Sequence, residues 1–429
     1  MNDDFEKLNK YSLKIKNFLD NNAITYYIDC KNSDSLIIRL ISDTFKQSTK
    51  KKYDITNIKH EIIKKLHEYD DSPLLYIILG KEMEIIDKMD FYKWIRINFR
   101  DIDLKGDKYK KYHNILFNPC ANRKELHNMM YDGIFVSLDV LHHSESENLI
   151  YDVYKNDKNE IHVYTPESET KSKLNINLVL QIFDFYRTLT KKNLPIKLVV
   201  FYGSQKKLLS DEKPICSDNV NSGSTMAGEI IHIWRKEEFY KVLIHELVHY
   251  FSIDFYTSDQ IYKKINSHFK QMINIKGIDR INESYTEIFA IVVHSVIFSE
   301  LNYINFDTVF SYELLFSYFQ VAKLLNHFEC EQYNDILRNE FVQTTSAFSY
   351  YIVKCMFMEK IGKVLQFWDS NGFVILGNAE DEYVELYKDI VKFESLDKNK
   401  INALIKLING YANCFVKKTM RMSMFQIVE

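Results

Sequence analysis

The sequence predicts an α+β protein with a mixed N-terminal part, a central α/β unit and a mainly helical C-terminal part. Between Asn148 and Thr165, two runs with alternating apolar residues flank the polar turn Asn-Asp-Lys-Asn, which is the pattern of a β-hairpin. From about Asp259 onward, apolar and aromatic residues recur with helical period almost throughout. We therefore expect three regions, comprising residues 1–145, 146–257 and 258–429.

The individual elements follow from local period and from changes in polarity. In the N-terminal part the pattern predicts a helix, Asp54–Tyr69, and two short apolar strands, Ala23–Ile28 and Leu74–Leu79. After the hairpin, the pattern predicts a helix, two strands and a second helix that follows the last strand directly. These four elements are Ile176–Thr190, Ile196–Tyr202, Glu229–Trp234 and Lys236–Phe251.

Composition and charge exclude several classes of protein. The 429 residues include only 11 Gly and 5 Pro, which excludes collagen-like and linker-rich chains and any large glycine-rich phosphate-binding system. A formal net charge of −3 provides no overall attraction for nucleic acid. The six cysteines form no CxxC pair, which argues against a cysteine zinc cage and a dense disulfide framework.

The chain shows no sequence pattern for secretion or membrane insertion. Its first residues are acidic and polar, unlike a signal peptide. The longest apolar run, Ile288–Phe298, is too short to span a bilayer. We therefore expect a soluble intracellular protein with neither a membrane nor a nucleic acid as its partner.

The residues with the clearest chemical signature form the segment HELVH, residues 245–249. On a helix, His245 and His249 project from adjacent turns of one face, so their imidazoles can share one zinc ion. Glu246 lies about 100° away around the helix axis, where it can take a proton from a water molecule that the metal activates. By chance the bare pattern would arise in roughly 3% of chains of this composition, and the apolar residues around it make it more specific.

A catalytic zinc site of this class needs a third protein ligand and an open position. The spacing for a third histidine would place it at residue 255, which is Phe255. Farther along the chain, Glu283 and Glu287 stand four residues apart in the segment NESYTE, so both carboxylates lie on one face of a predicted helix. One carboxylate can bind zinc while the other accepts the free ring N–H of a ligating histidine. We expect Glu283 to be the ligand.

Other residues remain alternatives at this stage. Asp279 is a rival third ligand. Asp254 fits either the end of the active-site helix or a partner of a ligand. His294 lies on the stripe of Glu283 but three turns farther on, about 16 Å away along a straight helix, so a buried hydrogen-bonded histidine is the better interpretation.

The segments HELVH and NESYTE together resemble the gluzincin metallopeptidases, the thermolysin-like group of zinc enzymes. The resemblance covers roughly residues 196–300 and implies a zincin-like catalytic unit, Zn²⁺ as cofactor and a peptide or protein as substrate. By position, it implies the following roles: zinc ligands at His245, His249 and Glu283, a catalytic base at Glu246, and at Glu287 the acidic residue that orients a histidine.

The same resemblance implies a substrate strand and an oxyanion-stabilising residue. Residues 221–225 and the strand that leads to Trp234 resemble the edge-strand region that holds an extended peptide in these enzymes, which implies that Asn221, Ser222 and Gly223 bind substrate. The candidates for stabilising the oxyanion are Tyr350, Tyr351 and His327. Residues 221–251 and the A+T-rich codon bias of the composition also look like those of uncharacterised metalloproteases of giant DNA viruses, which implies a viral protein in the host cytoplasm or the virion.

Three functions follow from these patterns. The first is a zinc metallopeptidase. The second is a catalytically silent or structural zinc-binding virion protein, although such a protein has no need for the carboxylate of Glu246. The third is a toxin-like metalloprotease acting on a host protein, although the segment NESYTE differs from the pattern of such toxins.

Overall fold

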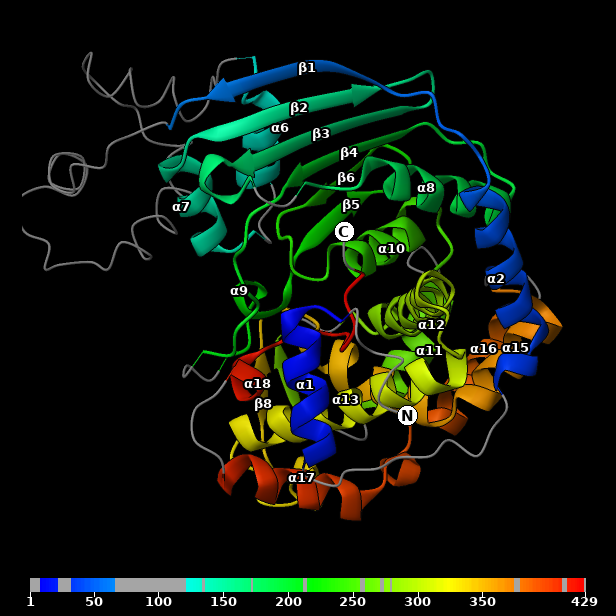
Figure 1. Cartoon of the computed structure of the whole chain (residues 1–429). Helices are drawn as coiled ribbons and strands as arrows, with labels where there is room; N and C mark the ends of the chain where they lie inside the picture. The colour runs from blue at the N-terminus through cyan, green and yellow to red at the C-terminus, as the bar shows by residue number, and fades with distance from the viewer. Residues whose placement is uncertain are drawn as a thin grey trace, which may run out of the picture.

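The computed structural model describes residues 8–21, 32–65, 121–132, 136–170, 173–210, 214–254, 259–270, 274–277, 280–373, 379–410 and 415–427. Within these ranges the chain has the predicted α+β class, with one mixed sheet and a helical C-terminal part. In Figure 1 the sheet lies across the top of the molecule, and the long helices lie beneath it. The predicted strands Ala23–Ile28 and Leu74–Leu79 fall outside the described residues.

The main sheet has six strands in the order β1-β2-β3-β4-β6-β5. The β3–β4 and β4–β6 pairs are parallel, and the other three pairs are antiparallel. The strands are β1 (Thr56–Ile63), β2 (Leu149–Lys155), β3 (Asn159–Pro166), β4 (Ile196–Phe201), β5 (Gly223–Met226) and β6 (Ile230–Ile233). The hairpin and the two later strands predicted from the sequence are confirmed, and β5 is an edge strand that overlaps the segment likened to one in the sequence.

The predicted helix Asp54–Tyr69 is wrong over its described part. Residues Thr56–Ile63 form strand β1, which pairs antiparallel with β2. Four β-branched residues in this segment suit a strand, and the ladder with β2 provides the hydrogen bonds that a helix would have supplied internally. The region 1–145 thus contributes a strand to the sheet of the central part.

The helices of the central and C-terminal parts cover one face of this sheet. Helix α10 packs against β5, β6 and α8 on one side and against α12 on the other, and α12 also packs against α13 (Figure 1). The α-helices are α1 (Lys10–Asn21), α2 (Leu36–Thr49), α6 (Lys124–His127), α7 (Leu138–Ser146), α8 (Ile176–Thr190), α9 (Ser217–Val220), α10 (Phe239–Tyr250), α11 (Asp259–Lys270), α12 (Asn282–Asn302), α13 (Phe306–His327), α14 (Lys354–Glu359), α15 (Ile361–Asn371), α16 (Glu380–Ile390), α17 (Lys398–Gly410) and α18 (Phe415–Lys418). The helix α8 has the predicted bounds, and α10 lies within its predicted range.

Two short strands interrupt the helical part. Strand β7 (Ile275–Gly277) pairs in parallel with β8 (Phe341–Gln343). Gly277 has a φ of 111°, and a Cβ there would lie 1.8 Å from the Gln343 carbonyl oxygen, so only glycine allows this approach. The pairing of β7 with β8 brings the start of α12 close to the segment that follows β8. The start of α12 and this segment both contribute residues to the site described below.

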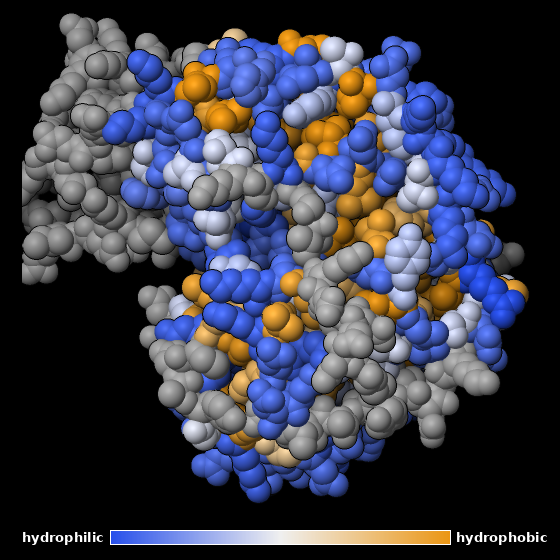
Figure 2. All heavy atoms as spheres, viewed as in Figure 1, coloured by the Kyte–Doolittle hydropathy of each residue, from blue (hydrophilic) through white to orange (hydrophobic). Residues whose placement is uncertain are grey.

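Among the described residues, one helix is long and apolar enough to cross a membrane. This helix is α12, whose 21 residues make it longer than the apolar run Ile288–Phe298 noted in the sequence. Of its most apolar 18-residue window, 89% is buried inside the protein. Burial on this scale is typical of the core helix of a globular protein. In the space-filling view hydrophilic residues make up most of the visible face, with hydrophobic residues mainly toward its middle (Figure 2).

Candidate metal centre

Helix α10 carries the HELVH segment in the interior of the protein. Every residue of α10 except His249 is buried. The helix begins at Phe239, after Glu238 turns the backbone with a φ of 57°. Beyond its end, Ser252 has a φ of 50°, and the chain reverses so that Asp254 returns toward His249. These two left-handed residues mark where helix α10 starts and where it stops.

The predicted ligands His245, His249 and Glu283 come together. The Nε2 atoms of the two histidines lie 3.2 Å apart, and Glu283 Oε2 lies 3.4 Å from His245 Nε2 and 3.5 Å from His249 Nε2. Ligand atoms about 2.0–2.2 Å from a tetrahedral zinc ion lie roughly 3.3–3.6 Å from one another. Glu283 Oε2 is buried and has no hydrogen-bond partner among the described residues. The spacing and the donor types therefore fit a zinc ion.

Each histidine has a carboxylate beside its other ring nitrogen. Glu287 Oε1 lies 2.8 Å from His245 Nδ1, although not along the ideal hydrogen-bond direction, and Asp254 Oδ2 lies 2.9 Å from His249 Nδ1. Such partners select the tautomer that directs Nε2 toward a metal. Glu287 thus lies where it was predicted, beside a candidate ligand. Asp254 also contacts a candidate ligand, which agrees with the second of its two interpretations.

The electrostatics of the cluster favour a cation. Burial works to lower the pKa of His245 and His249, but the neighbouring carboxylates, chiefly Glu283 and Glu287 for His245 and Glu283 and Asp254 for His249, raise both values. Burial works to raise the pKa of Glu283 and Glu287, but nearby positive charges hold both values far below the usual range. A buried group of carboxylates around two imidazoles is stable only when positive charge is present among them.

The carboxylate of Glu246 lies against strand β5. Its Oε2 accepts a hydrogen bond of 2.8 Å from the Thr225 hydroxyl. A Cβ at Gly223 would lie 2.5 Å from Glu246 Oε1, so the absence of a side chain at Gly223 makes room for the carboxylate. Burial raises the pKa of Glu246. Thr225 belongs to the segment likened to an edge strand, but its contact with Glu246 was missed from the sequence, where no local spacing relates the two residues.

A cavity of about 230 Å³ lies beside these groups. The three candidate ligands, Glu246 and Tyr350 line it. Its lining also includes the exposed residues Ala227, Ser252 and Arg280, so the cavity reaches the surface. The candidate metal position therefore borders a space into which another molecule can enter.

Two of the three residues predicted to bind substrate line this cavity. Asn221 and Gly223 belong to its wall, with Asn221 Oδ1 accepting a hydrogen bond of 2.9 Å from the Thr345 hydroxyl. Ser222 does not line it and borders only a smaller cavity of about 40 Å³, whose lining also includes Asn221 and Gly223. Because side chains alternate along an extended chain, neighbouring residues face opposite sides.

The structure separates the two candidate tyrosines. Tyr350 lies in the π-helical turn η7 (Ser349–Val353) and lines the cavity, with its ring centroid 6.2 Å from that of His245. The Tyr351 hydroxyl points elsewhere and donates a hydrogen bond of 2.6 Å to the Met420 carbonyl. Consecutive residues of a helical turn project in different directions, so only one of the pair can face the site. Tyr351 is therefore not placed to act there.

The remaining rivals lie away from the centre or outside the described residues. Asp279 is not among the described residues. His294 is buried against Phe298, as expected, and its Nδ1 has no hydrogen-bond partner among the described residues. His327 ends helix α13 and stacks edge-on against Phe328.

Sequence reasoning also missed Lys241, which forms a buried ion pair with Glu287. The available signal was a lysine in an otherwise apolar stretch, one helical turn before His245.

The chain matches no protein-family model, no curated protein and no solved structure.

Proposed function

We propose that the chain is a zinc-dependent metallopeptidase of the gluzincin type that hydrolyses peptide bonds in a peptide or protein substrate. The observation that carries the proposal is the arrangement of His245, His249 and Glu283, whose ligand atoms have tetrahedral spacing on the wall of an accessible cavity. The carboxylate of Glu246 stands on the same wall. When bound, zinc supplies Lewis acidity, which polarises a carbonyl group and lowers the pKa of water.

Glu246 has the properties of the general base. Burial raises its pKa above the ordinary carboxylate value, which makes the carboxylate a stronger base. The Thr225 hydroxyl hydrogen-bonds Oε2, which leaves Oε1 to accept the proton of an attacking water molecule. Glu246 then returns this proton to the leaving amine.

Tyr350 has the properties of an oxyanion donor. Burial raises the pKa of its phenol well above the ordinary value, so the hydroxyl keeps its proton at neutral pH. The hydroxyl can donate a hydrogen bond to the oxygen that becomes negative as the carbonyl is attacked. Tyr351, with its hydroxyl bound to a backbone carbonyl, has no such opportunity.

Strand β5 offers a place for extended substrate. It ends the strand order of the main sheet and lies beside Glu246. A peptide can add to such an edge as a further strand, through main-chain hydrogen bonds. Asn221 and Gly223 would then lie next to the bond that is cleaved.

The accessible cavity favours catalysis over a purely structural zinc site. Structural zinc is normally enclosed by four protein ligands, whereas catalytic zinc has three and keeps one position open. Here three candidate ligands from the described residues adjoin a cavity that reaches the surface.

The test is metal analysis combined with peptide hydrolysis. We expect about one zinc per chain, and cleavage of a peptide library that stops on chelation and returns with added zinc. Protein that binds no zinc, or cleavage that is indifferent to chelation, would overturn the proposal.

A further inference from the structure

A buried lysine lies one helical turn before the first candidate ligand. Lys241 is 1% exposed and, with Glu246, is one of only two residues of α10 that belong to Asp, Glu, Lys or Arg. Its Nζ donates a hydrogen bond to Glu287 Oε1. Burying an ammonium group is costly unless it has a specific partner, so its position demands an explanation.

Lys241 and His245 contact the same oxygen atom. Glu287 Oε1 accepts from Lys241 Nζ and lies 2.8 Å from His245 Nδ1. The other oxygen of Glu287 is buried without a hydrogen-bond partner among the described residues. Lys241 and His245 are four residues apart, so a carboxylate from α12 can bridge them across one turn of α10.

We infer that Lys241 is a positioning residue of the metal centre: it holds Glu287 against His245 and thereby directs His245 Nε2 toward the metal. Without this cation the buried carboxylate would keep only the contact with the His245 imidazole and the nearby charge of Lys354, and it would move toward water or toward another cation. The inference rests on the metal-binding part of the proposed function and not on peptide hydrolysis.

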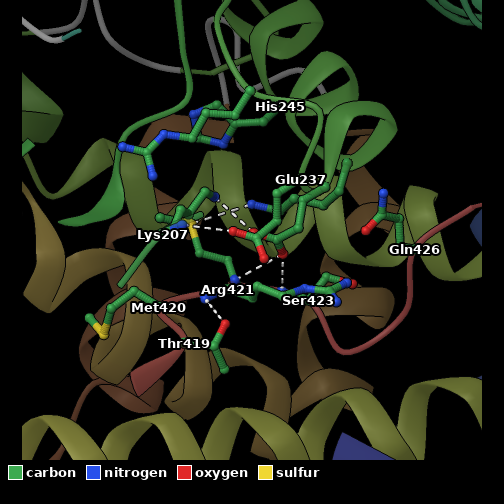
Figure 3. A network of polar contacts seen from close by, with 12 residues as sticks. Lys207, Glu237, His245, Thr419, Met420, Arg421, Ser423 and Gln426 are labelled. Carbon is green, nitrogen blue, oxygen red and sulfur yellow. Dashed lines mark hydrogen bonds and ion pairs between the residues drawn. The ribbon is translucent and has the colours of Figure 1, made fainter. Parts of the chain in front are cut away.

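The C-terminal segment Thr419–Ile427 touches Lys241 through Met422 and otherwise binds the neighbouring Glu238. The sulfur of Met422 lies 3.5 Å from Lys241 Nζ. The backbone N–H groups of Met422 and Ser423 donate to Glu238 Oε1 at 2.9 and 2.6 Å, and Lys207 Nζ donates to Glu238 Oε2 at 2.8 Å. In Figure 3 this network lies below His245, with Lys207, Arg421 and Ser423 gathered in it.

The same network provides a matched control. Lys207 is also 1% exposed and is also paired with a buried glutamate, but that glutamate is Glu238. The loss of Lys207 therefore removes a buried cation of the same kind without removing the contact to Glu287. The two lysines separate a specific effect on the metal centre from a general effect of removing buried charge.

The experiment measures zinc affinity by competition with a chromophoric chelator, and no substrate is needed. For Lys241→Met we expect zinc affinity to fall about 10- to 100-fold, the range for lost partners of ligating histidines. We expect Lys241→Arg, which keeps the cation, to recover most of the affinity. The control Lys207→Met should bind zinc within a few-fold of the wild type.

A double variant shows whether Lys241 acts through Glu287. If it does, Lys241→Met combined with Glu287→Gln will bind zinc no more weakly than Glu287→Gln alone. The double variant leaves no unpaired buried carboxylate at residue 287. Its comparison with Glu287→Gln therefore gives an answer even if Lys241→Met alone does not fold.

Three outcomes would overturn the inference. Zinc affinity that is unchanged by Lys241→Met, or that falls equally in the presence and absence of Glu287, would overturn this inference alone. A wild-type protein that binds no zinc would overturn both the inference and the proposed function.

Discussion

The Thr225 hydroxyl donates a hydrogen bond of 2.8 Å to Glu246 Oε2, which ties the candidate base on helix α10 to the edge strand β5. The strand proposed to hold a substrate therefore also orients the carboxylate proposed to act on it. This contact joins residues 21 positions apart in the sequence. It links the position of a bound peptide to the direction in which Glu246 points.

Replacing Glu246 by glutamine should abolish hydrolysis without removing the metal. The amide keeps the size of the side chain but cannot take a proton from water, so we expect kcat to fall by roughly 10²- to 10⁴-fold. Zinc content should stay at about one per chain, because Glu246 is not among the candidate ligands. Equal hydrolysis by the variant and the wild type would exclude Glu246 as the base.

Replacing Glu283 by alanine should weaken zinc binding directly. The substitution removes the only carboxylate among the candidate ligands drawn from the described residues. Loss of a residue that only supports a ligand lowers metal affinity 10- to 100-fold, so for a ligand itself we expect zinc affinity to fall on the order of 100-fold or more. Chelator competition measures this. Undiminished zinc retention would show that the third ligand is another residue.

The two neighbouring tyrosines form a matched pair. We expect Tyr350→Phe to lower kcat by about 10²-fold, the usual effect of losing one oxyanion donor, with a smaller effect on KM. Tyr351→Phe removes a hydroxyl bound to the Met420 carbonyl and should lower stability rather than kcat. Steady-state kinetics and thermal unfolding of both variants distinguish these roles, and a reversed pattern would exclude Tyr350.

His294 should make stability depend on pH. Burial lowers its pKa to about 3 in the folded protein, whereas the unfolded chain has a value near 6.5. Below about pH 6.5 the unfolded chain binds a proton that the folded chain does not, so the free energy of unfolding falls as pH falls toward 3. Between pH 7.5 and 5.5 the wild type should lose roughly 1 kcal/mol more than His294→Gln.

Denaturant unfolding of both proteins across this range measures the difference. All other histidines are common to the two proteins, so the difference isolates His294. Parallel stability curves would show that His294 is protonated as readily in the folded protein as in the unfolded chain.

Local sequence patterns predicted much of the fold because they act over short distances. The alternation around residues 156–159 requires only neighbouring strands, and the hairpin formed as predicted. The segment Thr56–Ile63 was misread because its hydrogen bonds go to β2, which stands more than 80 residues later. Pairing over such a distance leaves little trace in a local window, so tertiary context overrode the apparent period.

By itself, the sequence determined that His245 and His249 share a helix face and that Glu283 and Glu287 share another, because helical period fixes both relationships. Only the tertiary structure decided that the two faces meet, that Tyr350 rather than Tyr351 faces the cavity, and that Thr225, Asp254 and Lys241 complete the surroundings. These relationships depend on how α10, α12, β5 and the C-terminal segment pack together. That packing is set by buried contacts between segments far apart in the chain, which no local spacing encodes.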